Sequence, residues 1–289
     1  MISITKQLAK NMLEEQFPQF KDLEITDIKI GGWDNKVFRL GDDKLIKMPI
    51  AKKYEIQIDT TFHWLPKLAN HLPFKIPQPL GRGKPSPAYP FKWAIYNWIE
   101  GDTVFESKNI DGEKFADDLV TFIKDLHKIN IDNAPAPSIH NFYRGGDLRI
   151  YDTEIIASIS ALKGKIDYRK AMQIWEKSIA SQYHDSPLWI HGDLSLGNIL
   201  LEEGQIKAII DFGMIAAGDP ACDLAVAYNI FTADVREEFI IKMDMKKDVW
   251  DRAKGWALWK SLISFANPKA TNVVEATRAK FVLKELGVI

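Results

Sequence analysis

Apolar and polar positions change their spacing near residue 25 and again near residue 100. From about Ile4 to Phe17 the apolar residues recur at helical spacing, and Pro18 ends this pattern. One further helical segment is expected at about 54–70, and the proline-rich stretch 73–90 is expected to be extended and irregular. Short apolar runs separated by glycine turns predict β-strands at 24–30, 37–40, 44–48 and 93–99.

Beyond Gly101 the pattern is mostly helical. Apolar residues between Phe115 and Ile129 lie at intervals of three to four, which predicts an amphipathic helix. Two polar helices are expected within about 151–183, and helical spacing returns at about 248–286. Strands followed by helices favour an α+β fold of two lobes, with a small antiparallel sheet in residues 1–100 and mostly helices in 101–289.

Composition narrows the class of protein further. The 289 residues are 46% hydrophobic and 27% charged, as in ordinary globular proteins, and the net charge of −1 argues against a nucleic-acid partner. Cys222 is the sole cysteine, which excludes an intrachain disulfide and fits a reducing compartment. Apolar runs of about 18 residues are missing, and the first 17 residues do not resemble a signal peptide. We therefore expect a cytoplasmic protein without a membrane partner, present as a monomer or weak dimer.

Three oxygen-bearing side chains follow one another at the spacing that phosphoryl transfer needs. Asp193 lies in His-Gly-Asp, Asn198 comes five residues later, and Asp211 opens Asp-Phe-Gly. A tight turn at Glu203-Gly204 folds the intervening strands into a hairpin, so positions 198 and 211 lie nearly opposite each other, about 5 Å apart. One cation could then accept oxygens from both. The spacing predicts Asp193 as the base that receives a hydroxyl proton, and Asn198 and Asp211 as ligands of Mg²⁺.

Other residues are candidates for supporting roles around this motif. Lys47, on an otherwise apolar strand, is a candidate cation for nucleotide phosphates, although a lone strand lysine more often extends to the surface. The glycine turn at 31–35 is either a phosphate-binding lid or an ordinary hairpin turn. His191 is expected to hydrogen-bond the loop backbone, and Asp223 to cap a helix or hold the catalytic loop.

With these motifs in place, the chain resembles the aminoglycoside phosphotransferase family, small-molecule kinases with a protein-kinase-like fold. The resemblance implies a nucleotide-binding N-terminal lobe, a helical lobe with the catalytic loop and substrate site, and ATP or GTP with Mg²⁺. It also implies nucleotide contacts from Gly32, Asn35, Asn97, Trp98 and Ile99. The motifs that carry it lie at 32–35, 40–43, 64–69, 71–73, 98–101, 191–193, 211–213, 218–223 and 255–260.

One position departs from the family pattern. Where the family usually has a Glu that pairs with the strand lysine, this chain has Thr61. Either Glu55 or Asp59 takes over the ion pair with Lys47, or the lysine is held less firmly, because a threonine offers only an uncharged hydrogen bond.

Three functions remain open from the sequence. The first is a kinase for an aminoglycoside-like antibiotic, with a cationic hydroxyl acceptor; the second is a metabolic kinase for choline, a hydroxy amino acid or a sugar amine; the third is a non-catalytic nucleotide-binding scaffold. Only four residues separate Gly213 from Gly218, which leaves no room for an activation loop and argues against a protein substrate. Carboxylates available for a cationic acceptor, or for a solvated helix face, are Asp244, Asp248, Asp251, Glu275 and Glu285.

Overall fold

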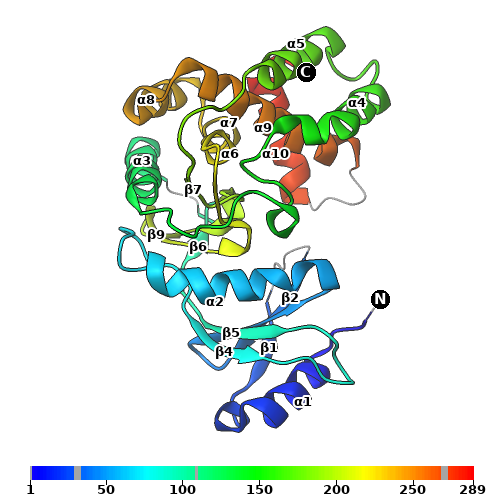
Figure 1. Cartoon of the computed structure of the whole chain (residues 1–289), viewed down its shortest axis with the longest axis vertical. Helices are drawn as coiled ribbons and strands as arrows, with labels where there is room; N and C mark the ends of the chain where they lie inside the picture. The colour runs from blue at the N-terminus through cyan, green and yellow to red at the C-terminus, as the bar shows by residue number, and fades with distance from the viewer. Residues whose placement is uncertain (1, 29–33, 108–109, 268–272) are drawn as a thin grey trace.

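The N-terminal lobe is built on a five-stranded antiparallel sheet (Figure 1). The computed structural model describes residues 2–28, 34–107, 110–267 and 273–289. The sheet has the order β1-β2-β3-β5-β4, and its strands are β1 (Ile25–Asp27), β2 (Asn35–Leu40), β3 (Lys44–Pro49), β4 (Pro79–Gly83) and β5 (Trp93–Asn97). The four strands expected from the sequence are present in the described residues; residues 29–30 of the first expected strand lie outside them, and the last strand ends at Asn97.

Strand β4 lies within the stretch expected to be irregular. Its backbone pairs with β5 at the edge of the sheet, with Gly83 opposite Trp93 and a register shift between Pro79 and Gly81. Prolines are tolerated at the first residue of an edge strand, because a missing N–H there removes no bond from a central ladder. The pairing was invisible in the local pattern.

Two helices lie on either side of this sheet (Figure 1). Helix α1 (Lys6–Gln16) buries Ala9, Met12 and Leu13 against sheet residues such as Phe38 and Trp93, which makes a small hydrophobic core of its own. Helix α2 (Ile56–Leu68) lies on the side facing the second lobe and joins the larger core instead. The two helices expected in residues 1–100 therefore pack into different hydrophobic cores, α1 into the small core and α2 into the larger one.

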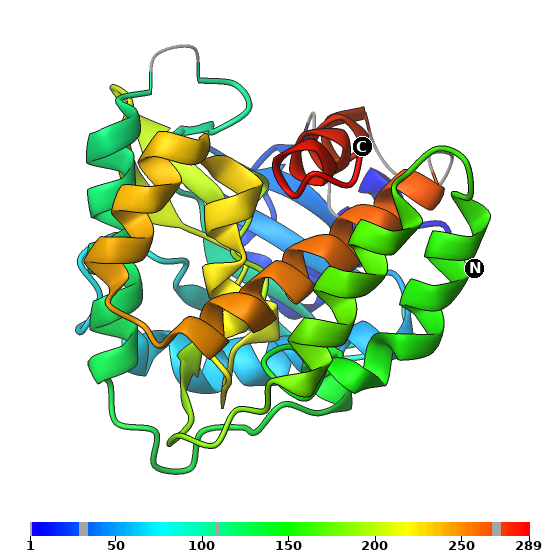
Figure 2. The ribbon, with the colours of Figure 1, turned by 90° about the horizontal axis from the view of Figure 1, so that it is seen from above.

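The C-terminal lobe consists mostly of helices (Figures 1 and 2). Its helices are α3 (Gly112–Lys128), α4 (Asp152–Ala161), α5 (Tyr168–Ala180), α6 (Ala221–Leu224), α7 (Val226–Ile230), α8 (Ala233–Met243), α9 (Lys247–Ala266) and α10 (Val273–Glu285). Short 3₁₀ turns lie at Pro18–Phe20, Lys52–Tyr54, Ile139–Asn141, Leu148–Tyr151, Leu196–Asn198 and Phe212–Met214. In Figure 2, α9 crosses the lobe beside α4 and α5, so its residues reach the interior.

Two small antiparallel sheets belong to the C-terminal lobe and lie on its side nearer the N-terminal lobe (Figure 1). Strands β6 (Asp102–Thr103), β8 (Ile199–Glu202) and β9 (Gln205–Ile209) form one sheet, and β7 (Leu188–Ile190) pairs with β10 (Ala216–Gly218). The two-lobed α+β fold is confirmed, whereas the domain boundary after residue 100 stays a prediction. None of the helices in the described ranges is long and apolar enough to cross a membrane.

Candidate active site

The loop after β7 is held by one buried carboxylate. Asp223, 1% exposed at the start of the helical stretch after β10, accepts the N–H of His191 at 2.6 Å and the N–H of Gly192 at 2.9 Å. Gly192 adopts φ +81°, and a Cβ there would lie 2.4 Å from the Met214 carbonyl oxygen, so only glycine fits. Asp223 thus fixes the backbone just before Asp193.

His191 links the two ends of the site. Its Nδ1 accepts the N–H of Asp193 at 3.2 Å, so Nε2 carries the proton and donates to the Ile210 carbonyl oxygen at 2.9 Å. The ring is fully buried and packs edge-on against Phe212. With both ring nitrogens bonded to backbone groups, His191 aligns the Asp193 loop with the Asp211 segment.

The hairpin between Asn198 and Asp211 is set by its turn and by one register shift: Glu202 pairs with Gln205, and the shift between Leu200 and Leu201 brings Ile199 opposite Ile209. Glu203 (φ +53°) and Gly204 (φ +80°) form the turn, and the Ile210 N–H donates to the Asn198 carbonyl oxygen at 2.9 Å. Asp211 itself is left-handed, at φ +63° and ψ +59°. Such a conformation is uncommon outside glycine and is found where the surroundings over-determine it, as at functional sites.

Asp193 lies between an amide and an ammonium group. Its Oδ1 accepts Lys260 Nζ at 2.7 Å, and its Oδ2 lies 3.3 Å from Asn198 Nδ2, which also donates to the Asp193 carbonyl oxygen. Burial alone would raise the pKa of Asp193, but the charges of Lys260 and Arg144 outweigh it and hold the pKa well below its usual range. Asp193 is therefore ionised at neutral pH.

Lys47 pairs with Asp211 across the two lobes. The Nζ–Oδ1 distance is 2.7 Å, and the lysine side chain is only 13% exposed. Burial acts to lower the pKa of Lys47, but Asp211 and then Asp34 outweigh it and hold the pKa above its ordinary value. The strand lysine thus points into the site, and the alternative that it extends to the surface is wrong.

Neither carboxylate suggested as a replacement partner pairs with Lys47 in the described part of the chain. Glu55 accepts Lys52 at 2.7 Å, and Asp59 accepts Lys92 at 2.6 Å. Thr61 bonds instead to the Tyr96 hydroxyl at 2.6 Å. The lysine is consequently oriented by Asp211, not by a carboxylate of α2.

Lys47, Asp193 and Asp211 line a cavity of about 1650 Å³, and the segment that joins the lobes lines it as well. Asn97, Trp98 and Ile99 line it, with the Asn97 N–H donating to Gln78 at 3.1 Å and the Trp98 N–H to Asp43 at 2.7 Å. Asn35 also lines it, 3% exposed and in contact with Gln57, and its amide oxygen lacks a hydrogen-bond partner in the described ranges. Gly32 lies outside the described residues.

The oxygen donors that remain fit a magnesium ion bound with nucleotide. Asn198 uses its amide nitrogen for Asp193, which leaves Oδ1, and Asp211 uses Oδ1 for Lys47, which leaves Oδ2. Both residues line the cavity. Mg²⁺ typically takes one or two protein oxygens together with phosphates and waters, so two donors suffice and a larger carboxylate cage is not required.

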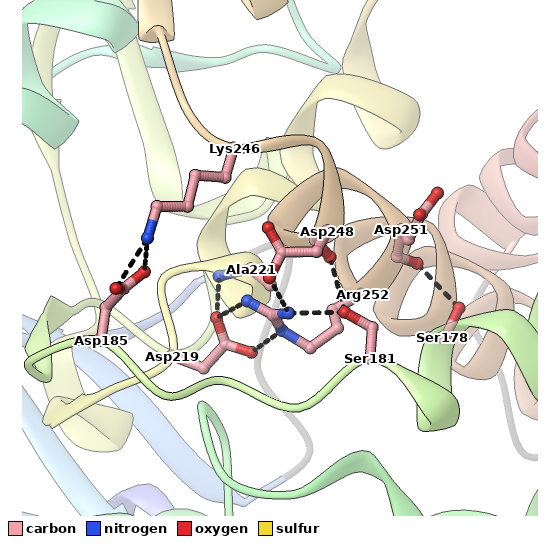
Figure 3. Close-up of polar contacts among 9 residues, drawn as sticks. All are labelled: Ser178, Ser181, Asp185, Asp219, Ala221, Lys246, Asp248, Asp251 and Arg252. Atoms are coloured by element: carbon pink, nitrogen blue, oxygen red, sulfur yellow. Dashed lines mark hydrogen bonds and ion pairs between the residues drawn. The ribbon is translucent and has the colours of Figure 1, made fainter.

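A buried ion pair joins α9 to the segment between β10 and α6 (Figure 3). Arg252 Nε lies 2.6 Å from Asp219 Oδ2, with both side chains at most 5% exposed, and Arg252 also reaches Asp248 and Ser181. Asp219 in turn accepts the Ala221 N–H, close to Asp223. This network ties α9 to the segment that holds the loop, and Lys260 lies about two helical turns further along.

Sequence reasoning did not name Lys260 or Arg144 as site residues. The segment 255–260 attracted notice only as a family motif, and Arg144 lies in a loop without periodicity. Their approach to Asp193 depends on how α9 and the 139–146 loop pack.

A five-stranded antiparallel lobe and a helical lobe, joined by the Lys47–Asp211 ion pair, form a protein-kinase-like fold. The comparisons agree. A model of the phosphotransferase enzyme family matches residues 24–256, and the chain belongs to that family.

Individual relatives are more distant. An aminoglycoside 3'-phosphotransferase of Escherichia coli is 27% identical over 141 residues, 47% of this chain and 52% of the relative, so the chain spans about half the length of the curated relatives it matches. The GDP and kanamycin complex of APH(2")-IIIa has a TM-score of 0.72 at 16% identity, covering 98% of this chain and 99% of that one. A macrolide 2'-phosphotransferase type I has a TM-score of 0.63 at 15% identity, covering 97% and 98%. These structures share the fold.

Proposed function

We propose that the chain is a small-molecule kinase that transfers the γ-phosphoryl group of ATP or GTP to a hydroxyl. The observation that carries this proposal is that Asp193, Asn198, Asp211 and Lys47 line one cavity and are hydrogen-bonded in pairs. A nucleotide donor is also supported by the GDP, ATP and ADP named in the complexes of similar structures. A scaffold without catalysis would not need an ionised Asp193 beside these groups.

The chain's own residues divide the work of the reaction. A bond forms between the acceptor's hydroxyl oxygen and the γ-phosphorus, while the bond from that phosphorus to the β–γ bridging oxygen breaks and nucleoside diphosphate leaves. Asp193 orients the hydroxyl and receives its proton. Lys47 contacts the phosphates, and Asn198 and Asp211 would hold Mg²⁺, which would supply neutralising charge to the phosphates. Backbone groups of Asn97 and Ile99 hold the adenine or guanine ring of the nucleotide. Trp98, Asn35 and Gly32 lie near the nucleotide.

For the acceptor, an aminoglycoside-like antibiotic is the first candidate, because the relatives are aminoglycoside phosphotransferases and one similar structure is a kanamycin complex. A metabolic hydroxyl acceptor is the second candidate. Among its members a hydroxy amino acid is favoured, because its carboxylate would be attracted to Lys260 and Arg144, whereas an aminoglycoside, choline or a sugar amine would be repelled. We further propose action in the cytoplasm as a monomer or weak dimer.

The proposed function is tested by nucleotide binding and turnover. Mg-ATP or Mg-GTP should raise the melting temperature, since a ligand that binds only the folded state stabilises it. A coupled assay for nucleoside diphosphate should then respond to one class among aminoglycosides, macrolides, amino alcohols, hydroxy acids and sugars. If neither nucleotide shifts the melting temperature in the presence of Mg²⁺, the proposal is wrong.

The pH profile should reveal the influence of Lys260 on the base. Because the pKa of Asp193 is held low, its protonation should limit the wild-type kcat/KM only below the usual carboxyl range. Lys260→Gln removes the main stabilising charge while burial remains, so the acid limb should move to higher pH. Lys260→Arg retains the charge and should retain the limb. An acid limb at the same pH in Lys260→Gln would contradict this assignment.

A further inference from the structure

The wall of the cavity beyond Asp193 carries positive charge close to the base. Lys260, from α9, lies 2.7 Å from Asp193, and its side chain is 37% exposed. Arg144 lines the same cavity and is the second cation, after Lys260, that depresses the pKa of Asp193. Both residues come from the helical lobe, where the family resemblance predicts the substrate site.

Arg144 is oriented but not charge-paired. Its guanidinium lies over the Trp259 ring, 4.4 Å from the centroid, with Trp256 at 5.9 Å. Its Nε is buried and has no hydrogen-bond partner among the described residues, and no carboxylate there forms an ion pair with it. A guanidinium that is stacked and unpaired retains its planar donors for a ligand, and carboxylates and phosphates are the groups that match them.

The loop that carries Arg144 is fixed to the catalytic segment. Asn141, fully buried, donates to the carbonyl oxygens of Arg144 and Met214 at 2.9 and 3.2 Å. The Asp219 N–H donates to the Gly145 carbonyl oxygen at 2.8 Å. Arg144 is thus held on both sides at a set position relative to Asp193, as a binding residue must be.

The carboxylates expected for a cationic acceptor are mostly engaged elsewhere. Asp248 pairs with Arg252, Asp251 with Lys177, and Glu285 with Arg236. Of the five proposed from the sequence, Glu275 is the one that lines the cavity in the described ranges. Glu154 also lines it and accepts Trp259 Nε1 at 2.6 Å. The cations, by contrast, lie beside the base itself.

We infer that Arg144 and Lys260 form a subsite for an anionic group on the acceptor, so that the substrate is a hydroxylated carboxylate or phosphate ester. This inference rests on the proposed phosphotransferase function. The anion binds Arg144 and competes with Asp193 for the Lys260 ammonium, which frees Oδ1 for the hydroxyl. The phosphoryl step is unchanged: the hydroxyl oxygen attacks the γ-phosphorus, the proton passes to Asp193, and nucleoside diphosphate leaves.

The test compares matched sugars on a protein whose nucleotide site is filled. With Mg²⁺ and a non-hydrolysable ATP or GTP analogue at saturation, binding of gluconate, glucose, glucosamine, glucose 6-phosphate and kanamycin is followed by tryptophan fluorescence, since Trp256 and Trp259 flank Arg144. Gluconate or glucose 6-phosphate should bind about tenfold or more tightly than glucosamine, as one charge-assisted contact implies. If gluconate binds more tightly than glucose 6-phosphate, the acceptor carries a carboxylate; if glucose 6-phosphate binds more tightly, it carries a phosphate.

Variants decide whether Arg144 causes the preference. Arg144→Gln should abolish the preference for anionic sugars, and Arg144→Lys should retain part of it. Lys260→Gln should independently weaken the same preference. Arg149→Gln is the matched control, because Arg149 lies in the same loop region, is exposed and pairs with Asp147.

Each remaining outcome overturns the inference. Tighter binding of glucosamine or kanamycin, equal binding of all probes, or a preference that survives both Arg144→Gln and Lys260→Gln would exclude an anion subsite. If the nucleotide analogue itself fails to bind, the proposed function is wrong; if it binds and cationic sugars bind best, only the subsite is wrong.

Discussion

Replacing Asp193 by asparagine should lower kcat for phosphoryl transfer by a factor of about 10²–10⁴, the usual contribution of a general base. Asparagine has the same shape and can still accept one hydrogen bond from Lys260 or Asn198, so the loop held by Asp223 should keep its structure. It cannot receive the hydroxyl proton. The measurement is steady-state kinetics with the acceptor identified by screening, together with calorimetric titration of Mg-nucleotide.

Asp211→Asn is the matched comparison, because it changes the other carboxylate of the site in the same way. Asp211 lies beside Lys47 and is proposed to hold Mg²⁺, so this variant should weaken metal-dependent nucleotide binding, whereas Asp193→Asn should bind Mg-nucleotide like the wild type. Turnover within tenfold of wild type in Asp193→Asn would remove Asp193 from the role of base. An unchanged magnesium dependence in Asp211→Asn would remove Asp211 as a ligand.

Arg252→Met should destabilise the protein by about 3–5 kcal/mol, because it leaves the Asp219 carboxylate buried without its cation. Asp219 is 5% exposed and would retain only the Ala221 N–H among the contacts drawn in Figure 3. The free energy of unfolding, from urea denaturation followed by tryptophan fluorescence, measures the effect. Since Arg252 also ties α9 to the loop segment, we expect transfer activity to fall together with stability.

Figure 3 contains the control for this experiment. Lys246 pairs with Asp185 at 2.7 Å, but the two side chains are 69% and 51% exposed, so Lys246→Met should leave the free energy of unfolding nearly unchanged. The double variant Arg252→Met/Asp219→Leu removes both buried charges and should recover much of the loss. Equal destabilisation by Lys246→Met and Arg252→Met would show that burial does not decide the importance of this pair.

Local patterns predicted most of the fold but not its pairing. The α1 and α3 helices and the strands around Lys47 follow from apolar spacing and turn residues, which act over a few neighbouring positions. Strand β4 was not predicted, because it forms through backbone hydrogen bonds to β5 and the proline-rich sequence has no pattern that indicates this pairing. The association of α2 with the core of the other lobe likewise depends on packing between segments distant in sequence.

The candidate site also has a part that local sequence predicts and a part that depends on packing. Asn198 and Asp211 were readable from the sequence because they flank one short hairpin with its turn at Gly204, and Asp193 because it lies only five residues before Asn198. The ion pair between Lys47 and Asp211 joins residues 164 positions apart, and that between Lys260 and Asp193 joins residues 67 apart. Such contacts are set by how lobes and helices pack. The sequence alone determined which candidate reactive side chains this protein carries, and only the tertiary structure decided which charges surround Asp193, since those charges arrive on α9 and on the loop of Arg144.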